Sequence, residues 1–269
     1  MRILLKVGGT LLDKPASRAG LARQLAALTA EHKLVVVHGG GKQMTRYLEE
    51  RGVESRFVNG LRVSDQAVID AASKVIAGSV NKQFVAALTA AGQLAIGLSG
   101  VDGRLTTARR MDGDLGFVGS PVRSDGRLLR LLIDGGYLPV VACLAADENG
   151  TIYNVNADGM AVSCAVAFGA QRLLFLTDVA GVHDREGRVL EHLVPADIMS
   201  LIESGVARGG MQAKLTAGAA AVAAGVTEII IASGHEPEVC RRVFEGEPLG
   251  TRLGNHWSPN LEPARRVAK

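Results

Sequence analysis

The chain has 269 residues, of which 47% are hydrophobic and 21% are charged, and its net charge is +3. This composition indicates a folded globular protein, and the even mixture of 30 Lys and Arg with 27 acidic residues argues against a nucleic-acid-binding protein. Cys143, Cys164 and Cys240 form no C-x-x-C motif, so we expect reduced thiols in a cytoplasmic protein, without a disulfide or a zinc site. No apolar run reaches the roughly 20 residues that cross a bilayer.

Six short apolar runs, each ending in a glycine-containing or polar turn, are expected to form strands. Their continuous rather than alternating apolar pattern predicts a mainly parallel sheet covered by helices, with ligands at the carboxyl ends of the strands. Helical patterns cover residues 22–32 and 42–52, whereas residues 103–129 are expected to form hairpins or loops. The fold class is therefore α/β, with a loosely held basic tail at residues 254–269. The six expected strands lie within residues 3–9, 34–41, 94–100, 138–144, 173–181 and 228–234.

Two glycine-rich turns follow the first two expected strands, at residues 8–9 and 39–41. Glycines let backbone N–H groups approach an anion, and the helix after the second turn offers its positive N-terminal end. Gln43 and Met44 stand where the Walker and dinucleotide motifs require Ser or Thr and glycine, so neither motif is present. The alternative is a pair of tight turns without a ligand. Because the turns follow neighbouring strands, we favour one anion bound between them.

Two lysines lie close to glycine pairs. Lys6 is inside an expected strand that is buried on both faces, where an unpaired cation is costly, so an anionic ligand explains it better than solvent does. Lys214 follows Gly209 and Gly210, in an early turn of an expected helix whose dipole disfavours a cation. A bound anion would remove that penalty. An ordinary solvated lysine would explain Lys214 equally well.

Asn154, Asn156 and Asp158 lie at every second position of one segment. In an extended chain this spacing places the three side chains on one side, where the amides could bind a ligand carboxylate and the aspartate could hold lysines. The alternative is an Asx-rich turn that caps a helix starting near Asp158. Arg62 follows an Asn-Gly pair and has a rigid guanidinium suited to bidentate contact with a carboxylate, although alone it would be a plain surface residue.

Taken in order, these segments resemble the amino acid kinase family: KVGG, HGGGK, NGLRVSD, GLSGVDG, NVNAD, TDVAGV and GGMQAK. The resemblance covers roughly residues 1–253 and is strongest to members that phosphorylate N-acetyl-L-glutamate in arginine biosynthesis. It implies an α/β/α sandwich, with a substrate-binding and dimerisation lobe at residues 1–170 and a nucleotide-binding lobe at 171–253. It also implies ATP as the phosphoryl donor, with Mg²⁺ held mainly by phosphates and water and no metal ligands from the protein.

The resemblance also implies a role for individual residues. Lys6 and Lys214 would stabilise the transferred phosphoryl group, and Asp158 would orient both lysines. Gly9 and Gly40 would donate backbone N–H groups to the phosphoryl oxygens. The implied substrate-binding residues are Gly40, Gly41, Arg62, Asn154 and Asn156. The implied nucleotide-binding residues are Asp178, Val179, Ala180, Gly181, Val182, His183, Val206, Ala207 and Arg208.

Two other functions remain open from the sequence. Residues 97–110 also resemble kinases that act on aminoadipate or glutamate bound to a small acidic carrier protein, and Arg104, Arg109 and Arg110 could contact such a partner. Ser64 stands where members of the amino acid kinase family more often have threonine. A non-catalytic nucleotide or amino-acid sensor on the same fold is the second alternative. Because the first expected strand begins at Arg2, without the preceding helix of arginine-inhibited members, we expect a homodimer that arginine does not inhibit.

Overall fold

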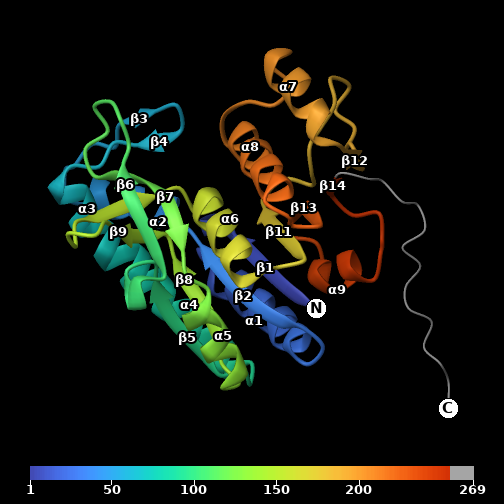
Figure 1. Cartoon of the computed structure of the whole chain (residues 1–269), viewed down its shortest axis with the longest axis horizontal. Helices are drawn as coiled ribbons and strands as arrows, with labels where there is room; N and C mark the ends of the chain where they lie inside the picture. Colours follow the sequence, from blue (N-terminus) through green and yellow to red (C-terminus); the bar gives the residue numbers. More distant parts are fainter. Residues whose placement is uncertain (255–269) are drawn as a thin grey trace.

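A central sheet runs through the whole protein, which we describe from a computed structural model covering residues 1–254 (Figure 1). All six apolar runs form strands of this sheet, whose order is β12-β14-β13-β11-β1-β2-β8-β5. Its pairs are parallel except for β13 with β14, which confirms the predicted α/β class. The strands are β1 Arg2–Val7, β2 Lys33–His38, β5 Ala95–Ser99, β8 Leu138–Ala142, β11 Arg172–Thr177, β12 His192–Leu193, β13 Glu228–Ser233 and β14 Thr251–Leu253.

Helices cover both faces of the central sheet, so that β1 and β2 are buried on both sides (Figure 1). Helix α6 packs on β1, β2 and β11 and contacts α8, whereas α1 and α4 pack on β2, β5 and β8 and contact each other. A π-helical segment, η2, joins α3 to α4 without a break. The helices are α1 Pro15–Thr29, α2 Gly41–Glu49, α3 Gln66–Ala72, η2 Ser73–Val80, α4 Asn81–Ala90, α5 Arg127–Asp134, α6 Ala157–Phe168, α7 Pro195–Glu203, α8 Gly209–Ala223 and α9 Val239–Phe244, with short 3-10 turns η1 Gly9–Leu12 and η3 Asp102–Arg104.

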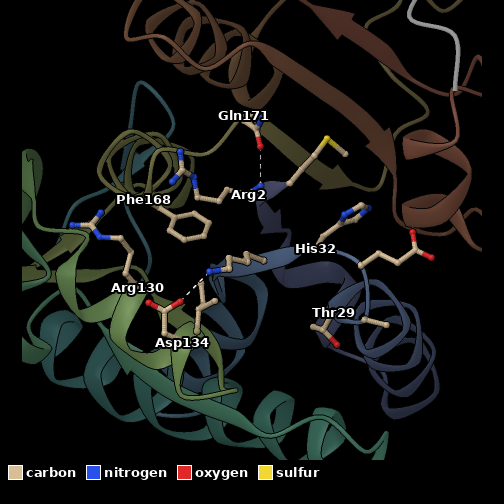
Figure 2. Close-up of a pocket in the computed structure, with 12 residues that line it drawn as sticks. Arg2, Thr29, His32, Arg130, Asp134, Phe168 and Gln171 are labelled. Atoms are coloured by element: carbon tan, nitrogen blue, oxygen red, sulfur yellow. Dashed lines mark hydrogen bonds and ion pairs between the residues drawn. The ribbon is translucent and has the colours of Figure 1, made fainter. Parts of the chain in front are cut away.

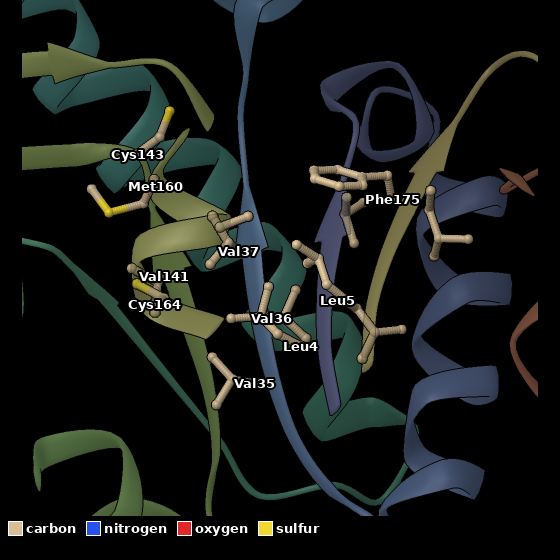
Figure 3. Packing of buried hydrophobic residues seen from close by; sticks show 14 of the residues in the cluster. Leu4, Leu5, Val35, Val36, Val37, Val141, Cys143, Met160, Cys164 and Phe175 are labelled. Atoms are coloured by element: carbon tan, nitrogen blue, oxygen red, sulfur yellow. The ribbon is translucent and has the colours of Figure 1, made fainter. Parts of the chain in front are cut away.

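The core between the sheet and α6 is made of aliphatic side chains and two sulfur-containing ones. Val35 and Val37 of β2 face Met160 and Cys164 of α6 (Figure 3). All four are fully buried or nearly so, and burial of a valine or methionine stabilises a fold by about 1.5–3 kcal/mol. The three cysteines are buried and free. This packing fixes the position of α6 relative to β1 and β2, which matters because α6 carries Asp158.

A small closed sheet and a hairpin lie beside the carboxyl ends of the central strands. β6 Thr106–Arg110 and β7 Val118–Ser124 are antiparallel, which confirms the hairpin expected within residues 103–129, although α5 already begins at Arg127. β9 Leu144–Ala146 and β10 Ile152–Val155 complete this sheet. The hairpin consists of β3 Phe57–Val58 and β4 Leu61–Arg62.

The division into lobes at residues 170 and 171 falls between α6 and β11, where the central sheet continues because β11 pairs with β1. The two-lobe organisation therefore stays a proposal. The expected basic tail lies outside the described residues, apart from Gly254. Within residues 1–254, no helix is long and apolar enough to span a membrane.

Candidate active site

Two lysines from distant parts of the chain contact one buried aspartate. Nζ of Lys6, in β1, lies 2.8 Å from Oδ1 of Asp158, and Nζ of Lys214, in α8, lies 3.5 Å from Oδ2 of the same residue. The three side chains are 9%, 14% and 8% exposed for Lys6, Lys214 and Asp158. The counter-charge of Lys6 is therefore a carboxylate of the protein itself, that of Asp158. One carboxylate contacts both ammonium groups, and Asp178 acts on Lys214 without forming an ion pair with it. The three residues in contact therefore carry an excess positive charge, which favours a further anion.

Burial and the neighbouring charges shift the pKa values in this cluster. Burial raises the pKa of Asp158, but the charges and hydrogen bonds of Lys6 and Lys214 lower it by more. The pKa of Asp158 is therefore below its usual value, and the carboxylate is ionised at neutral pH. Burial lowers the pKa of Lys214, and the charge of Lys6 adds to this, against the attraction of Asp158 and Asp178. A ligand anion beside Lys214 would raise its pKa again.

The segment that carries Asp158 changes from strand to helix immediately before it. β10 ends at Val155, and Oδ1 of Asn156 accepts hydrogen bonds from the N–H groups of Asp158 (2.8 Å) and Gly159 (3.3 Å). Asn156 is therefore the N-cap of α6, as the capping alternative proposes, and the extended-chain interpretation holds only as far as Val155. Asn154 lies within β10, and its Nδ2 donates to Oγ of Ser64 over 3.1 Å.

The two glycine turns meet next to this cluster. A side chain on Gly9 would come within 3.1 Å of Cα and 3.3 Å of the backbone nitrogen of Gly40, so any larger residue would push the turns apart. A Cβ on Gly39 would lie 3.4 Å from Cβ of Ala157, the residue before Asp158. Within residues 1–254, the N–H groups of Gly9 and Gly40 have no protein acceptor. Because Gly40 is buried, its free N–H is costly unless a ligand oxygen or water accepts from it.

Arg62 lies in a cavity beside the glycine turns. Its guanidinium is buried and donates to the carbonyl oxygen of Gly41 over 3.1 Å, to Oγ1 of Thr45 over 2.6 Å and to Oγ of Ser55. Burial lowers the pKa of Arg62 although Glu49 lies near. None of the ion pairs between described residues includes Arg62, so this buried cation is available to a ligand carboxylate. The cavity of about 610 Å³ is lined by Gly9, Thr10, Asp13, Gly41, Lys42, Thr45, Arg46, Glu49, Phe57 and Arg62.

The sequence pattern did not identify the side chains that hold the first glycine turn and the guanidinium of Arg62. Gln43 is buried, and its Nε2 donates to the carbonyl oxygen of Gly9 over 2.8 Å, which links α2 to the first glycine turn. Thr45 and Ser55 fix the guanidinium of Arg62. The available signal was the position of Gln43 and Thr45 in the first two turns of the helix after the second glycine turn, close to whatever that helix N-terminus binds.

The segments expected to bind the nucleotide come together around a second cavity, of about 450 Å³. Val179, Val182, His183 and Val206 line it, and Asp178 is near enough to affect the pKa of Lys214. Ala207 is buried, Gly181 packs against Thr251, and Arg208 is the N-cap residue of α8. Ala180 does not line this cavity. Asp184, Arg185, Ser204, Gly205 and Met211 also line it, and the sequence did not point to them.

A third cavity, of about 590 Å³, lies at the amino ends of β1 and β2, where Arg2 and Lys33 begin these strands (Figure 2). Its two arginines are used by the protein, since Nε of Arg2 donates to the carbonyl oxygen of Gly169 and a terminal nitrogen of Arg130 donates to that of Ala167. Both therefore cap the C-terminal end of α6. Lys33 is paired with Asp134 over 2.9 Å (Figure 2). We assign this cavity no role in the site.

Comparison with known proteins gives consistent results. The amino acid kinase family model matches residues 1–233. The chain is 56% identical over 254 residues to an acetylglutamate kinase of Solibacter usitatus, covering 94% of this chain and 99% of that protein. It is 41% identical over 266 residues to an acetylglutamate kinase of Rhizorhabdus wittichii, covering 93% and 88%. The solved N-acetylglutamate synthase of Neisseria gonorrhoeae, in complex with coenzyme A and N-acetyl-glutamate, superposes with a TM-score of 0.84 at 25% identity, covering 96% of this chain and 60% of that one.

Proposed function

The chain belongs to the amino acid kinase family, and we propose that it transfers the γ-phosphoryl group of ATP to the γ-carboxylate of N-acetyl-L-glutamate. The relatives from Solibacter usitatus and Rhizorhabdus wittichii are named for this activity. The product would be N-acetyl-L-glutamyl 5-phosphate, an acyl phosphate made in the second step of arginine biosynthesis.

The observation that carries this proposal is the excess charge at the centre of the site. Lys6 and Lys214 share the single carboxylate of Asp158, and the backbones of Gly9 and Gly40, whose N–H groups have no acceptor within residues 1–254, approach each other closely. Two ammonium groups and two N–H donors suit the oxygens of a phosphoryl group whose negative charge must be stabilised during transfer. A tight turn without a ligand would leave the buried N–H of Gly40 without an acceptor.

The chemistry requires no general base. The γ-carboxylate of the substrate is ionised at neutral pH, so one of its oxygens can attack the γ-phosphorus directly. A bond forms between that oxygen and phosphorus, the bond from phosphorus to the bridging oxygen of ADP breaks, and ADP leaves with the electron pair. The protein contributes by positioning, with Arg62 and Asn154 near the substrate carboxylate and amide, and by stabilising charge through Lys6, Lys214, Gly9 and Gly40.

The nucleotide would lie over the cavity that Val179, His183 and Val206 line. Within residues 1–254, no group of three or more His, Cys, Asp and Glu side chains is arranged to hold a metal ion, and both oxygens of Asp158 contact lysines. Mg²⁺ would therefore enter as the Mg-ATP substrate, where it neutralises phosphate charge.

The direct test is incubation of the purified protein with Mg-ATP and N-acetyl-L-glutamate, with hydroxylamine to trap the acyl phosphate as a hydroxamate. We expect hydroxamate with N-acetyl-L-glutamate and none with free glutamate. Failure with both substrates would refute the proposal and would direct attention to a carrier-bound substrate. ATP binding without any transfer would favour a sensor.

Three expectations from the sequence stay predictions. They are the homodimer, the cytoplasmic location and the absence of inhibition by arginine. Addition of arginine to the hydroxamate assay and measurement of the molar mass in solution would test the first and the last of these.

A further inference from the structure

A buried histidine precedes the second glycine turn. His38 is the last residue of β2 and is 0% exposed. Its Nδ1 lies 2.8 Å from the carbonyl oxygen of Gly39, and its Nε2 lies 3.0 Å from Nδ2 of Asn81, at the start of α4. The same Nδ2 donates to the carbonyl oxygen of Val140 in β8 over 2.9 Å. His38 is thus tied to the turn on one side and to the neighbouring strand and helix on the other.

These contacts allow one arrangement of protons on the imidazole. A carbonyl oxygen only accepts, so Nδ1 must carry the proton that it donates to Gly39. Nε2 then accepts from the amide of Asn81, whose nitrogen is identified by its second bond, to Val140. Burial lowers the pKa of His38 to about 4, so the ring stays neutral, with this single tautomer, at any pH at which the enzyme would be assayed.

The bond to Gly39 determines where the N–H of Gly40 points. The peptide that joins the two glycines is planar and trans, so its N–H points away from its carbonyl group. With the carbonyl held by His38, the N–H lies on the opposite side, and the nitrogen is 3.3 Å from the place that a Cβ of Gly9 would occupy. The nitrogen of Gly40 therefore lies beside the first glycine turn, and its N–H is on the side of the peptide opposite to the carbonyl that His38 holds.

The π-helical segment η2 supports the same turn from behind. A Cβ on Gly40 would meet Cγ1 of Ile76 at 3.2 Å and Cγ2 of Val80 at 3.5 Å, both from η2. Asn81 follows this segment directly, as the first residue of α4. Glycines have no side chain to fix a peptide orientation. The contacts from Ile76, Val80 and His38 supply that restraint.

We propose that His38, held by Asn81, is a positioning residue that fixes the Gly39–Gly40 peptide so that the N–H of Gly40 is preorganised for the transferred phosphoryl group. This proposal rests on the proposed function for the identity of the group that accepts from Gly40. A preorganised donor contributes to transition-state stabilisation more than to ground-state binding, so the loss of orientation should lower kcat and leave KM for ATP largely unchanged.

Two variants separate the two bonds of the imidazole. In His38→Asn, the side-chain amide nitrogen can take the place of Nδ1 and keep a donor for Gly39. In His38→Gln, the longer side chain reaches the place of Nε2 and can keep the bond to Asn81, but it offers no donor at the position of Nδ1. We expect kcat of His38→Asn to stay within about threefold of the wild type and kcat of His38→Gln to fall at least about tenfold, the loss typical of a misplaced donor.

Both variants remove a buried ring, so both should lower Tm, and kcat alone distinguishes them. Thr106→Val is a matched control, because it removes the hydrogen bond of a buried hydroxyl group to the half-buried Ser124, away from the glycine turns. It should lower Tm without the loss of kcat. Equal loss of kcat in His38→Asn and His38→Gln, or a loss that follows Tm through all three variants, would overturn the proposal.

A measurement without turnover keeps this inference separate from the proposed function. Nitrogen-15 NMR of labelled protein distinguishes the two neutral tautomers of a histidine, and His38→Gln assigns the signal. We expect the Nδ1–H form from pH 6 to pH 8. The Nε2–H form would contradict the donation to Gly39 and overturn the proposal even in an active enzyme. A wild-type protein that makes no hydroxamate but shows the Nδ1–H form would refute the proposed reaction and leave the peptide orientation intact.

Discussion

Nζ of Lys6 lies 2.8 Å from Oδ1 of Asp158, and this ion pair joins the central strand β1 to the first turn of α6. A lysine inside a strand buried on both faces requires a counter-charge, and the sheet places that charge one layer away, on the helix that covers it. The second oxygen of Asp158 contacts Lys214. The cluster therefore holds two cations near one anion, and each of its members can be tested separately.

Replacement of Lys6 by alanine should lower kcat by about 100-fold or more, with a small effect on KM for ATP. One preorganised charged donor typically contributes this much to the transition state. The hydroxamate assay at saturating Mg-ATP measures it. Lys33→Ala is the control, because Lys33 lies on the neighbouring strand but is exposed and paired with Asp134. An unchanged kcat in Lys6→Ala would remove Lys6 from the mechanism.

The alkaline limb of the pH profile should depend on Lys214. Burial lowers the pKa of Lys214, so in the free enzyme kcat/KM for ATP should begin to fall below the usual lysine pKa of about 10.4. Lys214→Arg keeps the charge to higher pH, because a guanidinium does not lose its proton in this range. The limb should therefore move to higher pH in Lys214→Arg, at reduced kcat. If both proteins show the same limb, another group controls it.

Replacement of Asp158 by asparagine should destabilise the protein in a pH-dependent way. The folded-state pKa of Asp158 is lowered, so the stability that the carboxylate contributes is fully present above about pH 5 and is lost as the pH falls through the folded-state pKa. Above about pH 5 the variant leaves two buried ammonium groups without the carboxylate that both of them contact, which costs about 3 kcal/mol or more.

Thermal unfolding at several pH values measures this difference. The gap in Tm between the wild type and Asp158→Asn should be largest near neutral pH and should narrow on acidification. Asp134→Asn, which breaks an exposed ion pair with Lys33, should change Tm little at any pH. A gap that stays constant with pH would mean that the effect of Asp158→Asn comes from packing and not from charge.

The sequence predicted the central sheet because its strands are continuous apolar runs that end in glycine turns, and this pattern depends on local residues alone. It also pointed to Lys6 and Lys214, since a lysine is unusual in a buried strand and at the start of a helix. The residue pattern alone indicated only that Asp158 could hold lysines, because a pairing with both Lys6 and Lys214 depends on how α6 and α8 pack together. The pairing with both lysines was implied by the resemblance to the family, and the structure has both contacts. The role of Asn156 was ambiguous for a local reason, since the same spacing fits a strand and a helix cap.

The supporting contacts were beyond the sequence for a different reason. Asn81 and Val140 meet His38 through the order of the strands, which places β8 beside β2, and through the packing of α4 on β8. The π-helical segment that brings Asn81 to this point has no sequence pattern that separates it from an ordinary helix.

The nucleotide cavity can be tested by introducing a negative charge at its wall. Val206→Asp places a carboxylate where the phosphates and adenosine of ATP would have to approach. KM for ATP should rise at least about tenfold, while KM for N-acetyl-L-glutamate should remain close to the wild-type value. Val194→Asp, at an exposed valine before α7, is the control. An increase in both KM values would indicate general damage and not a local effect on the nucleotide.

Arg62 should determine the affinity for the amino-acid substrate. Its guanidinium is buried, is held by Thr45 and Ser55, and has no carboxylate partner among the ion pairs of residues 1–254. Lysine at this position keeps the charge but loses the planar fork that contacts two oxygens of a carboxylate. A hydrogen bond to a charged group contributes about 1.5–3 kcal/mol, so KM for N-acetyl-L-glutamate should rise about 10- to 100-fold in Arg62→Lys.

The KM for ATP should be unaffected in this variant, because Arg62 lies in the cavity beside the glycine turns and not in the one near His183. Arg56→Lys provides the matched control on the same segment, since Arg56 is exposed and paired with Asp114. Steady-state kinetics with each substrate varied in turn separates the two KM values. If Arg62→Lys changes kcat and leaves KM for N-acetyl-L-glutamate unaltered, the arginine contacts the reacting groups and does not bind the substrate carboxylate in the ground state.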